Sequence, residues 1–189
     1  MVIDCAKGVE QRTVKLMEVC RLRDTPIMTF INKLDREGRE PVDLLDEIES
    51  VLGIECSPVT WPIGMGRSLK GVYHLLQDRI YLYHAGKKEQ ASTIEAIDRL
   101  DSEEATRILG DDADSFREEI ELVKGACPEL NFQDYLAARQ THVFFGSAIS
   151  NFGVRELLDE FVEHAPPPRS HESEQRVVQA DEKDLTGFV

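Results

Sequence analysis

Asn32, Lys33 and Asp35 follow directly after a short apolar run, residues 26–31 (PIMTFI). Such a run is typical of a strand buried on both faces of a parallel sheet, and ligands bind at the carboxyl ends of these strands. A carboxylate accepts two hydrogen bonds side by side, and guanine offers its N1–H and 2-amino groups in that arrangement. Adenine would leave Asp35 unpaired, which disfavours the wrong base by about 10⁴. The spacing predicts a loop that recognises guanine.

The other two residues of the loop have supporting roles in this interpretation. The aliphatic stem of Lys33 lies along the base plane, and Asn32 ties the loop together and reaches the base edge through its amide. The Asn-Lys-x-Asp pattern is short, so two alternatives stay open. Asp35 begins a turn before the next helix, and Lys33 is a solvated surface side chain.

A second candidate loop, residues 146–149 (GSAI), follows a second apolar run, residues 142–145 (HVFF). A small residue there lets backbone N–H groups approach a ligand closely. We expect the Ala148 N–H to donate to guanine O6, the base acceptor that a carboxylate cannot serve. The alternative is a tight strand-to-helix turn in which Ser150 or Asn151 caps the helix.

The elements that position these loops follow from periodicity and helix-boundary residues. Residues 1–4 and 26–31 are predicted strands joined by a helix over 9–22, and a helix over 41–52 ends at Gly53. Short strands and turns are expected from 56 to 83. They precede three short helices: one capped by Asp101 and ending near Gly110, one over 115–124, and one capped by Asn131. After the strand at 142–145, a helix carries an apolar stripe of Val154, Leu157, Leu158, Phe161 and Val162.

Alternation of strands and helices predicts an α/β fold of three layers with a mostly parallel sheet, interrupted by an inserted α+β subdomain. The expected division is 1–52 for the first part of the main domain, 53–140 for the insertion, 141–165 for its last strand and helix, and 166–189 for a linker and the start of another domain.

Composition limits the function classes. The chain has 189 residues, 41% of them hydrophobic, and a formal net charge of -14. That charge argues against a nucleic-acid surface, and no apolar run is long enough to span a membrane. Without a secretory signal the chain is expected to be cytoplasmic. The cysteines and histidines lack ligand spacing, so we assign them no metal and no catalytic role: Cys5, Cys20, Cys56, Cys127, His74, His84, His142, His164 and His171.

Three stretches, residues 2–49, 57–66 (SPVTWPIGMG) and 143–169, together resemble the bacterial class II peptide chain release factor family, release factor three, among the translational GTPases. The resemblance implies the carboxyl-terminal part of a P-loop GTPase-type domain that binds GTP or GDP. It implies guanine contacts from Asn32, Lys33, Asp35 and the backbone around Ser147, Ala148 and Ile149. It also implies the ribosome and codon-reading release factors as partners.

The sequence departs from the family where the phosphates are held. It contains no Gly-x-x-x-x-Gly-Lys-Ser/Thr motif, and no Asp-x-x-Gly motif followed by a catalytic histidine. We expect these, and the Mg²⁺ ligands of the full-length protein, upstream of Met1, and barrel domains after Val189. The chain alone is therefore expected to hydrolyse nothing. The alternative function is a non-catalytic fragment with weak guanine binding or a protein-interaction role, whose apolar strand at residues 1–4 exposes an aggregation-prone edge.

Overall fold

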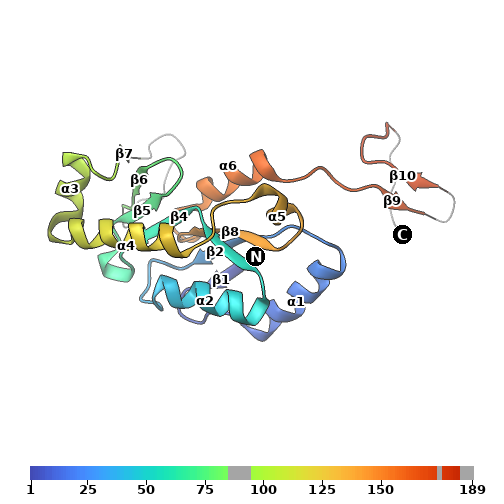
Figure 1. The fold of residues 1–189 in the computed structure, drawn as a ribbon, viewed down its shortest axis with the longest axis horizontal. Coiled ribbons are helices and arrows are strands. Elements are labelled where there is room, and N and C mark those ends of the chain that lie inside the picture. Colours follow the sequence, from blue (N-terminus) through green and yellow to red (C-terminus); the bar gives the residue numbers. More distant parts are fainter. Residues whose placement is uncertain (85–94, 174–175, 184–189) are drawn as a thin grey trace.

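The centre of the molecule is a four-stranded parallel sheet, seen in a computed structural model that describes residues 1–84, 95–173 and 176–183. The strand order is β1–β2–β8–β3. The strands are β1 (Val2–Asp4), β2 (Met28–Asn32), β3 (Glu55–Pro58) and β8 (Gln140–Phe145). Figure 1 shows α6 (Val154–His164) on one side of the sheet, and α1 (Gln11–Leu22) and α2 (Pro41–Leu52) on the other. These layers confirm the predicted α/β fold with a parallel sheet.

A second, antiparallel sheet with the order β4–β5–β6–β7 follows β3 in the chain. Its strands are β4 (Thr60–Ile63), β5 (Gly71–His74), β6 (Arg79–Leu82) and β7 (Ala96–Asp98). Helices α3 (Glu103–Leu109), α4 (Ala113–Ala126) and α5 (Phe132–Leu136) lead back to β8. Strand β3 pairs with β8 and so belongs to the parallel sheet, and the second sheet therefore begins only at Thr60. The proposed division at residues 53 and 140 stays a prediction.

The two sheets share one hydrophobic core. The Trp61 ring meets the Phe145 ring edge-on at 5.4 Å between centroids. The Phe145 N–H donates to the Thr60 hydroxyl at 2.9 Å, in a fully buried position. The end of β8 is therefore packed directly against the start of the second sheet.

Most predicted helix boundaries are confirmed, with local corrections. Helix α2 starts with Pro41 in its first turn and ends at Gly53, whose φ of 56° is left-handed, as glycine permits. The buried face of α2 includes Leu44, whereas Val42 is 50% exposed. Helix α3 is capped by the Ser102 hydroxyl, which accepts a bond from the Ala105 N–H, so the predicted cap at Asp101 is wrong by one residue.

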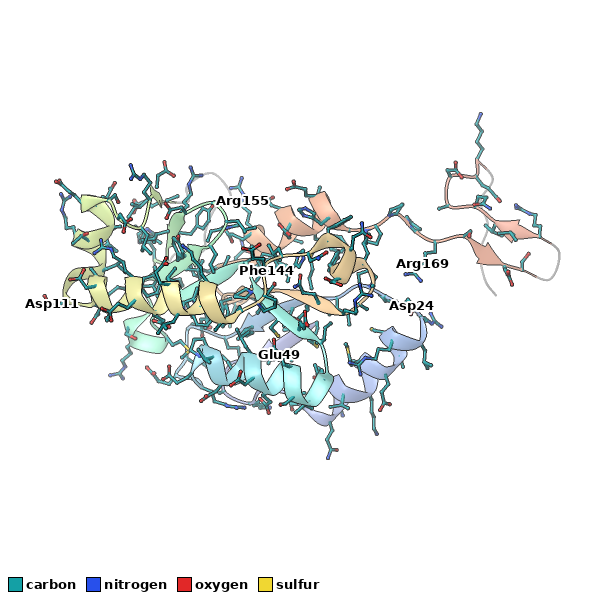
Figure 2. The ribbon with its side chains drawn as sticks, in the orientation of Figure 1. Asp24, Glu49, Asp111, Phe144, Arg155 and Arg169 are labelled. Carbon is teal, nitrogen blue, oxygen red and sulfur yellow. The ribbon has the colours of Figure 1, made fainter. Side chains whose placement is uncertain are left out.

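Helix α6 buries a different face from the one that its apolar stripe predicts. Val154 and Leu157 are half-buried against Phe144 and its neighbours, and Figure 2 labels Phe144. The rest of the stripe is open to solvent, with exposed fractions of 53% for Leu158, 53% for Phe161 and 82% for Val162. The most buried side chain of the helix is Glu156, and burial raises the pKa of its carboxyl.

The segment after α6, predicted as a linker, contains a two-stranded antiparallel ribbon of β9 (His171–Glu172) and β10 (Val177–Val178). The Arg169 guanidinium donates to the carbonyls of Arg23 at 3.1 Å and Asp24 at 2.5 Å, and Figure 2 labels Arg169 and Asp24 close together. Residues 184–189, which fall in the predicted start of another domain, lie outside the described residues. Among the described helices, none is long and apolar enough to cross a bilayer.

An apolar groove of about 610 Å³ runs beside β1, between α1 and α6. Among the described strands, β1 pairs only with β2. Val2 on its edge is 64% exposed, and Leu16 across the groove is 66% exposed. A strand edge flanked by apolar side chains is a template for pairing with another chain.

We predict that this 189-residue chain self-associates through the β1 edge and that Val2→Lys weakens the association by at least about tenfold, since an edge lysine opposes strand pairing. Val42→Lys is the matched control, because Val42 is 50% exposed on α2, away from the groove. Sedimentation velocity over a concentration series measures both. A wild-type chain that stays monomeric and unfolds in one cooperative transition would contradict the prediction.

His74 on β5 is a buried histidine held in the neutral state. Its side chain is 5% exposed, and its Nδ1 accepts the Gln77 N–H at 3.4 Å, which requires that Nδ1 carry no proton. Burial lowers the pKa of His74 from 6.5 to about 4. Between these values the unfolded chain binds a proton that the folded chain does not. Stability contributed by neutral His74 is therefore complete above pH 6.5 and lost as pH falls toward 4.

We predict that His74→Asn flattens the loss of stability between pH 6.5 and pH 4 by up to about 3 kcal/mol. Asparagine keeps an acceptor for the Gln77 N–H but does not titrate. Urea unfolding at pH 7.0, 5.5 and 4.5 gives the two slopes. The assignment to His74 fails if the variant and the wild type lose stability in parallel.

Candidate functional site

The two predicted loops leave the sheet side by side. Strands β2 and β8 are parallel neighbours, with Ile31 opposite Phe145. The Leu34 N–H donates to the Gly146 carbonyl at 3.1 Å, and the Gly146 N–H donates to the Ile31 carbonyl at 3.0 Å. The carboxyl ends of both strands are thus joined by backbone bonds, at the edge of the sheet where ligands bind in open α/β folds.

The Asn32 side chain links the loops. Its Oδ1 accepts the Lys33 N–H at 2.8 Å and the Ala148 N–H at 2.9 Å. Because both partners are donors, the amide oxygen must face them, and the amide nitrogen must face the other way as a donor. Asn32 therefore ties its own loop together and also joins it to the second loop. Donation from Ala148 to a base oxygen stays a prediction, and it requires that this N–H be shared or exchanged between two acceptors.

The Asp35 carboxylate is held by the second loop. The Ser147 hydroxyl donates to Asp35 Oδ1 at 2.5 Å, and Ser147 is fully buried. The Asp35 side chain keeps 21% of its surface exposed, and Arg36 lies 3.9 Å from Oδ2. A carboxylate offers about four lone-pair positions, so Asp35 retains acceptor capacity toward solvent. Asp35 lies in a turn closed by the Arg36 N–H to the Lys33 carbonyl, as the alternative proposed, but it caps no helix, since α2 begins after Glu40.

Lys33 adopts a strained backbone with a φ of 74°. Its ammonium pairs with Asp4 Oδ2 at 2.6 Å, and its carbonyl accepts the Cys5 thiol at 3.3 Å. The hydrogen bond from Lys33 holds the pKa of Asp4 below its usual range, so this ion pair is lost only in acid below that range. Burial raises the pKa of Cys5, so its thiol keeps the proton that it donates. Lys33 is therefore fixed at both its backbone and its side chain.

Gly146 is required for packing within the protein. A Cβ there would lie 2.3 Å from the Phe152 carbonyl and 2.7 Å from the Phe30 ring. Neither Ser150 nor Asn151 caps α6, because the cap position is Gly153, with a left-handed φ of 74°. The side chain of Ile149 is 76% exposed. The loop instead closes on itself through two backbone bonds between Ser147 and Phe152, at 2.9 and 3.0 Å.

The second sheet also contacts the first loop. The Gly66 N–H donates to the Leu34 carbonyl at 2.8 Å. A Cβ at Gly66 would lie 2.3 Å from Glu37 Oε1 and 3.1 Å from the Glu37 nitrogen. Leu34 is thus bonded on one side to β8 and on the other to the turn at Gly66–Ser68.

Comparisons with known proteins address the fold and the family. Residues 1–167 match the elongation factor Tu GTP binding domain. The chain belongs to this family. A crystal structure of a protein from Thermus thermophilus matches with a TM-score of 0.61 and 20% identity, over 88% of this chain and 26% of that one. At that identity the likeness shows the fold alone, and this chain spans about a quarter of the length of the matching protein.

This chain therefore contributes to the GTP-binding domain of a translational GTPase, a family that binds guanine nucleotides. The structure brings four of the six predicted site residues into direct contact: Asn32, Asp35, Ser147 and Ala148. In the described part of the chain, no group of three histidine, cysteine or acidic residues is placed to hold a metal ion.

Sequence reasoning missed Asp4, the partner of Lys33 in the GTP-binding domain. A signal for it was present, because Asp4 ends β1, the strand beside β2, and its register partner is Asn32. Applying the rule of carboxyl strand ends to all three neighbouring strands would have found it.

We predict that Ser147→Ala lowers the free energy of unfolding by about 1–3 kcal/mol, the typical effect of removing a bond to a charged group. Amide hydrogen exchange should accelerate at Leu34 and Ala148, whose N–H groups bond across the two loops, because the loops lose a side-chain link. Ser115→Ala, which removes an exposed hydroxyl on α4, serves as the control. Unchanged exchange at Leu34 and Ala148 would show that the remaining bonds hold the loops without the Ser147 hydroxyl.

Proposed function

We propose that Asn32, Lys33, Asp35, Ser147, Ala148 and Ile149 form the guanine-recognising half of a nucleotide site. The observation that carries this proposal is the contact between the two loops, in which Ser147 fixes Asp35 and Asn32 fixes Ala148. Both loops lie at the carboxyl ends of adjacent parallel strands, where nucleotides bind in open α/β sheets.

Each group has a distinct part in base recognition. The Asp35 carboxylate accepts the guanine N1–H and 2-amino hydrogens, while Ser147 keeps it oriented. The Asn32 amide nitrogen donates to an acceptor on the opposite edge of the base. The Ala148 and Ile149 backbone lies where O6 would be received, and the Lys33 stem, held by Asp4, lies along the base plane.

We assign neither phosphate binding nor phosphate hydrolysis to any residue of this chain. Phosphates are held by backbone N–H groups, a lysine and Mg²⁺ ligands, and the sequence has no Gly-x-x-x-x-Gly-Lys-Ser/Thr motif. Bound Mg²⁺ would neutralise phosphate charge. In this proposal the residues of the two loops orient and select the base, and none of them is a catalytic residue.

At the level of the whole protein, we propose a cytoplasmic translation-termination GTPase that recycles codon-reading release factors from the ribosome. Support comes from the similarity of the loops to that family and from an α+β unit inserted between them. A second candidate, a non-catalytic polypeptide that binds guanine weakly, is favoured for this chain alone by the missing phosphate motif.

We predict that the 189-residue chain binds GDP weakly, with a dissociation constant above about 1 μM, because it lacks the charge-assisted phosphate bonds. It should still prefer GDP over ADP. Asp35→Asn should abolish that preference, a change of about 10²-fold or more, and improve binding of xanthosine diphosphate, whose C2 carbonyl can accept from the new amide. Calorimetry and NMR titration measure affinity and selectivity.

Asp43→Asn is the matched control, because Asp43 is an exposed carboxylate in the first turn of α2, outside the loops. Sub-micromolar GDP binding by the chain would refute the weak-binding prediction. Unchanged selectivity of Asp35→Asn for GDP over ADP would refute the assignment of Asp35.

A further inference from the structure

Three hydroxyl groups form a row that ends on Asp35. The Tyr83 hydroxyl lies 3.3 Å from Ser150 Oγ, and Ser150 Oγ lies 3.3 Å from Ser147 Oγ. Ser147 then contacts Asp35 Oδ1 at 2.5 Å. The first two distances are longer than those of strong hydroxyl bonds, and the last is at the short end of their range.

Counting protons gives the row a direction. A carboxylate can only accept, so the single Ser147 hydrogen is used on Asp35. Ser147 Oγ then acts as the acceptor toward Ser150, which must donate to it. Ser150 Oγ in turn has no second hydrogen for Tyr83, so Tyr83 donates to Ser150. Each hydroxyl donates once, and Ser147 and Ser150 each also accept from the next hydroxyl in the row, an arrangement in which each bond polarises its neighbour.

Tyr83 is well placed to hold this row because it is fixed on the second sheet. It follows β6 directly, and its N–H donates to the Lys70 carbonyl at 2.8 Å. Its ring packs at 5.2 Å from the ring of Phe152, which is 2% exposed and closes the loop on Ser147. Both the ring and the hydroxyl of Tyr83 therefore contact the second loop.

We propose that Tyr83 is a positioning residue for base recognition, whose hydroxyl fixes the Asp35 carboxylate through Ser150 and Ser147 and so strengthens the preference for a purine that carries a 2-amino group. The proposal rests on the proposed function and names a specificity determinant for it. It makes the second sheet part of the nucleotide site without any contact between Tyr83 and the nucleotide.

The orientation of the Asp35 carboxylate and the stability of the whole loop affect nucleotide binding in different ways. Inosine diphosphate differs from GDP only in lacking the 2-amino group, so the ratio of the two affinities reports how well Asp35 meets that group. Loosening of the whole loop would weaken both nucleotides together, whereas turning the carboxylate lowers the ratio.

The test is NMR titration of the 189-residue chain and its variants with GDP, inosine diphosphate and ADP. Tyr83→Phe keeps the ring against Phe152 and removes only the hydroxyl, and it should lower the ratio of GDP to inosine diphosphate affinity about two- to fivefold. Ser150→Ala should lower the ratio by a similar factor. The double variant should lose no more than either single one, because both interrupt the same row.

Tyr81→Phe is the matched control, since its hydroxyl lies on the same sheet but donates to Gln77 Oε1 at 2.6 Å, away from the loops. An equal fall in the ratio for Tyr81→Phe would overturn the proposal. So would an unchanged ratio in Tyr83→Phe when Asp35→Asn abolishes selectivity, and the proposed function would then stand. A wild-type chain that binds all three nucleotides equally would overturn the proposed function, and this inference with it.

Discussion

The hydrogen bond from the Ser147 hydroxyl to Asp35 joins residues that are 112 positions apart in the chain. Everything between them must fold so that β8 returns beside β2 in the correct register. The buried contacts of Phe145 with Thr60 and Trp61 show how this is achieved, because β8, the strand that leads to Ser147, is anchored at its end by the start of the second sheet. Formation of the proposed nucleotide site is thus tied to folding of the segment between β2 and β8. A parallel sheet assembled from such distant segments also has a high cost in loop-closure entropy.

The sequence predicted strands, helix ends and loops correctly wherever a short segment determines its own structure. The apolar run of β2 has every residue except its last buried, so its continuous hydrophobic pattern had one physical meaning. Helix α2 was bounded correctly because Pro41 and Gly53 act through their own backbone angles. The loop of Asn32 and Asp35 could be found for the same reason, since it directly follows the apolar run of a buried strand in the sequence.

The parts that could not be predicted depend on distant partners. The stripe on α6 gives the direction of a hydrophobic face but not what covers it, and in this structure Glu156 is more buried than Phe161. Strand β3 reads Glu-Cys-Ser-Pro, which has no strand periodicity, and it joins the parallel sheet because β8 pairs with it. Likewise, nothing in the sequence around Lys33 names Asp4 as the residue that would hold its ammonium group.

The contacts of Lys33 and Leu34 offset the cost of holding the first proposed guanine-recognising loop in its conformation. Lys33 holds a left-handed backbone that ordinarily costs about 1–2 kcal/mol. It is retained by a hydrogen bond from its N–H to Asn32, a bond from the Cys5 thiol to its carbonyl and an ion pair with Asp4. The Gly66 N–H holds the carbonyl of the neighbouring Leu34, and Gly66 has a left-handed φ of 56° that favours glycine. All of these contacts are made within the protein, so the loops are held by their own neighbours. At the proposed site, selectivity for the base would then depend on the Asp35 carboxylate and not on the phosphates, because specificity is a difference between two binding free energies and GDP and ADP carry the same phosphates.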